Sequence, residues 1–122
     1  MEIGDIVYVV YEGDLINVPS LKKETIKEFY KTGAGQEIVV LESGFCINRK
    51  HVDPTKDADC YDYVVAFTDR KRADEVLYKF NEAWLRLCSE RIKEIDTEFK
   101  LLREEQVKLL VMQDELKNKY NL

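Results

Sequence analysis

The residues best suited to chemistry lie in the second half of the chain, where aromatic rings alternate with an amide and several guanidinium groups. Rings that stack, an amide that reads a base edge and arginines that clamp phosphates are the groups that a purine nucleotide needs. The candidate ligand-binding residues in this part are Tyr78, Phe80, Asn81, Trp84, Arg86, Arg91 and Arg103. Phe80 and Trp84 are four residues apart, so on a helix they share one face and suit a packed core as well as a base platform.

A second set of candidates is basic. Clusters occur at Lys22-Lys23, at Arg49-Lys50-His51 and at Arg70-Lys71-Arg72. The last cluster opens a predicted helix, where free backbone N–H groups favour anions, although a solvated basic face has the same pattern. Arg49 and Lys50 join the candidate ligand-binding residues, whereas His51, flanked by cations, is expected at the surface rather than as a base.

The sequence carries no recognisable signature of catalysis or of a metal site. It contains no Gly-x-Ser-x-Gly, His-Glu-x-x-His, P-loop or dinucleotide-binding glycine pattern. The acidic loop 53–59 has calcium-like spacing, but its sixth position is not glycine and Val64 stands where a bidentate glutamate is needed. Cys46, Cys60 and Cys88 show no Cys-x-x-Cys spacing, and we expect reduced, buried thiols. We therefore predict no enzyme, no cofactor and no metal.

Composition places the chain among ordinary globular proteins. It has 122 residues, 45% of them hydrophobic and 35% charged, which is enough for one domain. The net charge of −5 disfavours a general binder of duplex nucleic acid, which carries a basic stripe. No apolar run reaches the roughly 20 residues of a membrane span, and the N-terminus lacks the basic and apolar regions of a signal peptide. We expect a cytoplasmic protein with no membrane contact.

All five glycines and both prolines lie at or before position 54, and this asymmetry divides the chain. The first part predicts short strands rich in β-branched and aromatic residues, bounded by turns. Segment 25–30 suits a strand or a helix, and the glycines that follow it favour a hairpin. The expected strands cover 5–12, 25–30, 37–41, 45–48 and 61–67. The predicted fold class is α+β: a small antiparallel β core of four or five strands over 1–67, as a sheet or half-open barrel, and a helical arm over 68–122.

The second part predicts one long helix from about 69 to 118, with Thr68 as N-cap and Asp69 in the first turn. Apolar residues recur from Leu77 to Tyr120 at an average step of about 3.6 residues, which is the period of a straight helix. A helix of some 50 residues extends roughly 75 Å, too far to bury its apolar stripe against a β core of this size. Either it folds back near Asp96-Thr97, or it packs against another protomer. Because no glycine or proline lies there, we favour a homo-oligomer.

The segment from Val18 to Leu77 resembles a layout of small bacteriophage proteins, in which a β core ends in a strand with a phenylalanine-threonine junction and a charged helix follows. The residues that carry the likeness are 64–77 (VVAFTDRKRADEVL) and the opening Gly4-Asp5-Ile6-Val7-Tyr8. In length and architecture the chain is similar to the anti-Thoeris sponge family. The resemblance implies an oligomer that sequesters cyclic ADP-ribose isomers made by TIR-domain defence proteins; it assigns no contact residues.

Two hypotheses follow. In the first, the protein is a non-catalytic sponge that binds a cyclic nucleotide between the β core and the helical arms. In the second, it is an oligomeric interaction protein whose basic residues only solubilise it. Both predict self-association, and they differ in whether a small molecule binds.

Overall fold

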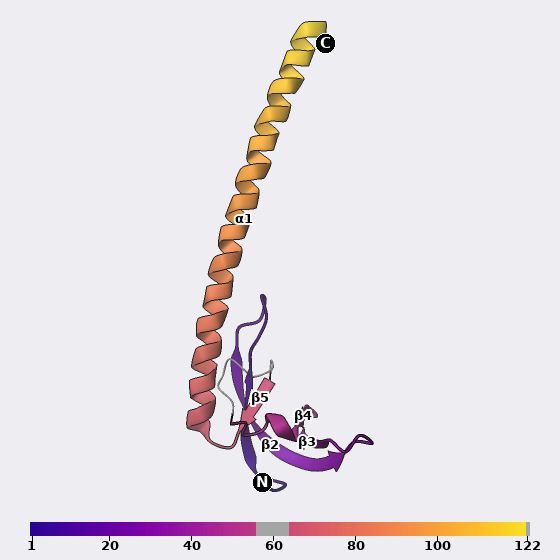
Figure 1. Ribbon diagram of the computed structural model, residues 1–122, viewed down its shortest axis with the longest axis vertical. Helices are drawn as coiled ribbons and strands as arrows, with labels where there is room; N and C mark the ends of the chain where they lie inside the picture. Colours follow the sequence, from indigo (N-terminus) through magenta and orange to yellow (C-terminus); the bar gives the residue numbers. More distant parts are fainter. Residues whose placement is uncertain (56–63, 122) are drawn as a thin grey trace. The chain divides into compact units, whose positions relative to one another are not determined.

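The computed structural model describes residues 1–55 and 64–121. Its elements are β1 (Ile6–Tyr11), β2 (Ser20–Lys31), β3 (Glu37–Leu41), β4 (Cys46–Asn48), the 3-10 helix η1 (Arg49–His51), β5 (Val64–Phe67) and α1 (Arg70–Tyr120) (Figure 1). The predicted strands and the long helix are found, but the strand predicted over 25–30 begins earlier, at Ser20, so the half of β2 that pairs with β1 was missed from the sequence. The first residues of the strand predicted over 61–67, part of the calcium-like loop 53–59 and Cys60 lie outside the described residues.

The strands form one antiparallel sheet in the order β4-β3-β2-β1-β5. The long strand β2 joins the two halves of the sheet: Ser20–Thr25 pairs with β1, and the part from Ile26 onward pairs with β3. The register shifts between Ile26 and Glu28, and such an irregularity bends a strand. The sheet therefore curls, as Figure 1 shows for β2, and the fold is α+β as predicted.

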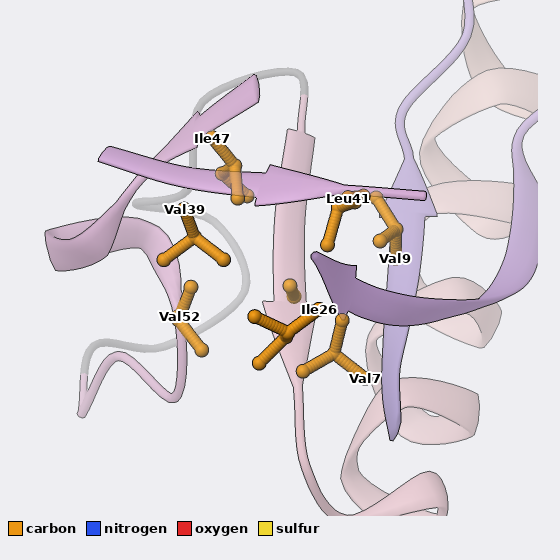
Figure 2. Packing of buried hydrophobic residues seen from close by; sticks show 8 residues of the cluster. Val7, Val9, Ile26, Val39, Leu41, Ile47 and Val52 are labelled. Carbon is orange, nitrogen blue, oxygen red and sulfur yellow. The ribbon is translucent and has the colours of Figure 1, made fainter. Parts of the chain in front are cut away.

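The concave side of the sheet holds the main hydrophobic core. Side chains from all five strands and from the segment after η1 form it, and the labelled ones point toward one another in Figure 2. The fully or nearly buried members are Val7, Val9, Ile26, Val39, Leu41, Ile47, Val52 and Ala66. Successive side chains of a strand face opposite sides of the sheet, so every second residue of these strands points into this core.

The first turns of α1 cover the opposite side of β1 and β5. Ala73, Val76 and Phe80 are buried there against Val10 and Phe67. Val65, Ala66 and Phe67 are all buried, since β5 is covered on both faces. Phe80 is therefore a core residue, which is one of the two roles that its spacing from Trp84 suggested.

The start of α1 differs from the prediction in one detail. Asp69, not Thr68, acts as N-cap: its side chain accepts a hydrogen bond from the backbone N–H of Lys71 at 3.0 Å. The Thr68 hydroxyl instead donates to the Asp53 carboxylate at 2.8 Å, and the Thr68 backbone N–H does so at 2.9 Å. Thr68 does not cap the helix because its hydroxyl and backbone N–H are hydrogen-bonded to Asp53, fifteen residues earlier in the chain.

The chain divides into two compact units, Met1–Arg86 and Leu87–Leu122. The first turns of α1 belong to the sheet unit because they carry its second hydrophobic layer. In the second unit every described residue from 89 to 121 is exposed. α1 is continuous through Asp96-Thr97, where the Thr97 hydroxyl donates to the Lys93 carbonyl oxygen at 3.0 Å, so the alternative of a helical hairpin is excluded.

The expectation of buried thiols is wrong for Cys46, which is exposed at the start of β4, while Cys88 on α1 is half-buried. Cys46 lies where a short edge strand meets a turn. The Cys46 side chain lies on the face of β4 that no second layer covers, because the second hydrophobic layer lies over β1 and β5.

Candidate functional site

The sheet unit has an open groove of about 780 Å³ between the β1–β2 loop and the turn before β4. This size lies in the range of small-ligand pockets, although the groove is wide open to solvent. It is lined by Tyr11, Gly13, Asp14, Ile16, Asn17, Val18, Ser20, Lys22, Phe45 and Val64. We call this surface the loop groove.

Two aromatic rings and one cation form the most specific part of the loop groove. The rings of Tyr11 and Phe45 meet edge to face, with centroids 5.7 Å apart. The Lys22 ammonium lies 5.6 Å from the centroid of the Tyr11 ring, within cation–π distance. Burial, and secondarily the charge of Glu24, raises the pKa of the Tyr11 phenol. The phenol therefore stays protonated at neutral pH and can donate a hydrogen bond to a ligand.

The β1–β2 loop is held in one conformation by its own hydrogen bonds. The Asp14 carboxylate accepts from the backbone N–H groups of Ile16 and Asn17 and from the Asn17 side-chain amide. These bonds, the Asn17 side-chain bond first, lower the pKa of Asp14. Gly13 adopts φ +80°, and a Cβ there would run into the Asn17 carbonyl oxygen. The wall of the groove is therefore preformed.

Trp84 ties this loop to α1. Its indole N–H donates to the Asp14 carbonyl oxygen at 2.8 Å, joining residues 70 positions apart in the sequence. The ring is half-buried. In this structure Trp84 is hydrogen-bonded to the loop that forms the groove wall and is not among the lining residues, whereas the sequence suggested it either as a core residue or as a stacking platform.

The other predicted residues of proximal α1 do not gather. Phe80 is 6% exposed in the second hydrophobic layer. Tyr78, two positions earlier and hence on another face, is 66% exposed. Asn81 is half-buried and Arg86 is exposed.

Arg49 and Lys50 lie in η1. The Arg49 guanidinium donates to the Val52 carbonyl oxygen at 3.3 Å, and the Lys50 backbone N–H donates to the Asn48 side chain at 3.1 Å. The Asn48 bond caps η1, so Lys50 projects an exposed ammonium while Arg49 is half-buried. Both belong to the sheet unit and neither lines the loop groove.

Arg91 and Arg103 belong to the second unit. Arg91 pairs with Glu94 at 3.1 Å and approaches Glu98 at 3.8 Å along its own helix. Arg103 forms no ion pair among the described residues. Neither is placed with the candidates of the sheet unit.

Sequence reasoning missed Tyr11 and Phe45, and it noted Lys22 only as part of the basic cluster Lys22-Lys23. Tyr11 and Phe45 are separated by 34 positions, and only the pairing of β1, β2, β3 and β4 brings their rings together. The only local signal was the Asp14-x-x-Asn17 spacing after Gly13, which is typical of a side-chain-stabilised turn.

Within 1–55 and 64–121, no group of three or more histidine, cysteine or acidic side chains is arranged to hold a metal ion. Nor does that part of the chain contain a helix with the length and apolar character needed to cross a membrane. Comparison with protein-family models, with curated proteins and with solved structures finds no match to this chain.

Proposed function

We propose that this protein is a non-catalytic interaction protein that assembles with copies of itself through the second unit of α1. The observation that supports it most directly is the exposure of that unit. Large apolar side chains, spaced to fall on one side of the helix, are about half to two thirds exposed, from 48% for Ile95 to 64% for Leu102. We call the following residues the distal stripe: Ile92, Ile95, Phe99, Leu102, Leu109, Leu116 and Tyr120.

The free energy available from covering the distal stripe is sufficient for association. Fully burying a large apolar side chain contributes about 1.5–3 kcal/mol, so members that are half to two thirds exposed contribute roughly 1–2 kcal/mol each per protomer. Summed over two copies, this gain matches or exceeds the roughly 4–15 kcal/mol that association costs in lost freedom. Helices of this kind also depend on packing of their apolar face for most of their stability.

A charge placed in the distal stripe tests the proposal. Phe99→Glu puts a carboxylate where the two copies meet, and we expect it to abolish self-association in sedimentation velocity of the full chain. Lys100→Glu is the matched control, because it introduces the same carboxylate one position later, on the outer side of the helix. Circular dichroism checks that both variants remain helical. A wild-type protein that sediments as a monomer at every concentration contradicts the proposal, as does equal loss in both variants.

Sequestration of a cyclic nucleotide remains a second proposal, and the loop groove is the observation that favours it. An aromatic pair could stack on a base and Lys22 could contact a phosphate. The surroundings are less favourable to a pyrophosphate, because Asp14 lines the same groove and Glu24 acts on Tyr11.

Thermal denaturation with cyclic ADP-ribose isomers and linear ADP-ribose separates the two proposals. A ligand at 100 times its dissociation constant stabilises the folded state by about 2.7 kcal/mol, which is a visible shift. A shift that Lys22→Ala removes and Lys23→Ala retains would establish nucleotide binding in the loop groove, since Lys23 does not line it. The absence of any shift leaves the interaction function alone.

A further inference from the structure

A heptad repeat runs through the second unit. From Cys88 to Tyr120, ten positions follow one another in alternating steps of four and three residues, and eight of them hold apolar residues while the other two hold glutamine. Over this stretch an average step of about 3.6 does not separate a straight helix from a heptad repeat, because alternating steps of four and three that begin and end with four have nearly the same average. The residues of this distal seam are Cys88, Ile92, Ile95, Phe99, Leu102, Gln106, Leu109, Gln113, Leu116 and Tyr120.

We propose that the occupant of the distal seam is a second copy of the chain that runs parallel to the first and in register with it. This inference rests on the proposed self-association and adds its direction and alignment. In heptad terms, Ile92, Phe99 and Tyr120 occupy position a, and Leu102, Leu109 and Leu116 occupy position d. Leucine at d is typical of parallel two-stranded coiled coils, and the glutamines of the seam and the charges beside it decide the direction.

Two glutamines in the seam select the alignment. Gln106 and Gln113 both occupy a positions, so in a parallel, in-register pair each amide meets the same amide of the partner and can hydrogen-bond to it. A shift by one heptad would keep one Gln106–Gln113 pair but place the other Gln106 against Phe99 and the other Gln113 against Tyr120. An antiparallel pair brings a against d, and the d positions hold only Cys, Ile and Leu. Either alternative buries amides without partners, which is unfavourable.

The charges that flank the seam agree with the parallel direction. Positions g and e of neighbouring heptads face each other across a parallel pair. This places Arg91 opposite the partner's Asp96 and Glu98 opposite the partner's Arg103, with opposite charges in both cases. Among the described residues of one chain, Asp96 and Arg103 form no ion pair, so both are available to the second copy.

The same charges oppose an antiparallel pair. If two antiparallel helices overlap fully over 88–120, they cross-align about position 104. Residues 103 and 105, which flank this position beside the seam, then lie near the same residues of the partner. Arg103 would then meet the partner's Arg103, and Glu105 would meet the partner's Glu105. Like charges held together in this way disfavour the arrangement.

The native thiol at Cys88 reports the direction. In the parallel, in-register pair the two Cys88 side chains occupy one layer of the seam and can form a disulfide. In the antiparallel pair they lie about 48 Å apart. The experiment uses the full chain with Cys46→Ser and Cys60→Ser, mild oxidation, and non-reducing electrophoresis alongside sedimentation velocity.

We expect a covalent dimer that forms in high yield and disappears in Cys88→Ser. In that cysteine-free background Leu116→Cys, again in the seam, should restore the covalent dimer, whereas Thr97→Cys, on the outer side of the helix, should not. A non-covalent dimer that links at neither Cys88 nor Leu116→Cys overturns the parallel arrangement while leaving self-association intact. A monomer throughout overturns both.

A charge exchange gives an independent measurement. Arg103→Glu and Glu98→Arg each replace attraction by repulsion at two symmetric places, and we expect each to weaken the dimer by about tenfold at low salt. The double variant Glu98→Arg/Arg103→Glu should regain most of the loss. Failure of the double variant to recover would contradict the proposed facing pair.

Discussion

Leu101 and Leu102 provide a matched test of which side of the second unit is covered by another copy. They are chemically identical neighbours, 60% and 64% exposed in the protomer. Leu102 lies in the distal seam, whereas Leu101 faces about 100° away around the helix. Any difference in dimer affinity between Leu102→Ala and Leu101→Ala is therefore due to the position on the helix, because the side-chain change and the change in helix propensity are the same.

The expected magnitude follows from the exposure. Full burial of a leucine side chain contributes about 1.5–3 kcal/mol, and Leu102 has roughly two thirds of its surface left to bury, which gives about 1–2 kcal/mol per protomer. A dimer contains the substitution twice, so Leu102→Ala should cost about 2–4 kcal/mol of association. At about 1.4 kcal/mol per tenfold, its dissociation constant should rise roughly 30- to 1,000-fold.

Sedimentation equilibrium of the full chain measures the dissociation constant of each variant. Leu101→Ala should change the free energy of association by less than about 0.5 kcal/mol, because its surroundings are the same in protomer and dimer. An equal effect of the two substitutions would refute the assignment of the covered side. A larger effect of Leu101→Ala would show that the side of the helix that carries Leu101 is the interface.

Three further predictions concern the β1–β2 loop. Trp84→Phe removes the hydrogen bond to the Asp14 carbonyl oxygen and should lower the free energy of unfolding by about 0.5–1.5 kcal/mol in urea denaturation, with the lower end favoured because water can reach this half-buried site. Gly13→Ala meets both a positive φ and the Asn17 carbonyl oxygen, and thermal denaturation should show a loss of more than about 1 kcal/mol; an unchanged melting temperature would contradict the preformed loop. Hydrogen bonds lower the pKa of Asp14 below its ordinary value of 3.8, so its stabilising effect is present above that pH and is lost as the pH falls through the lowered pKa. Asp14→Asn should therefore flatten the acid limb of the stability-versus-pH curve, and an unchanged acid limb would show that the carboxylate contributes nothing.

Local sequence signals predicted most of the elements. Glycines and prolines bounded the strands, and an unbroken run of good helix formers predicted α1 with ends close to Arg70 and Tyr120. The charged segment within β2 stayed ambiguous because its residues suit both a strand and a helix. Pairing with β1 on one half and β3 on the other decided it, and such pairing is a property of distant segments.

The candidate site was less predictable for the same reason. Spacing placed Phe80 and Trp84 on one helical face but could not say what that face would meet. Contact with Val10 and Phe67 made Phe80 a core residue, and the Asp14 carbonyl oxygen engaged the Trp84 indole. Likewise, Thr68 lost its capping role to a hydrogen bond with Asp53.

The sequence by itself determined a β unit, a long helix and an apolar repeat that the helix carries beyond the sheet, because hydrophobic periodicity and turn residues act over a few positions. Tertiary structure alone decided that the first turns of α1 belong to the sheet unit and that every described residue from 89 onward stays exposed. It also built the loop groove, whose Tyr11 and Phe45 rings meet only through the curled sheet. These outcomes depend on which surfaces are brought together across the chain, and no local pattern encodes that.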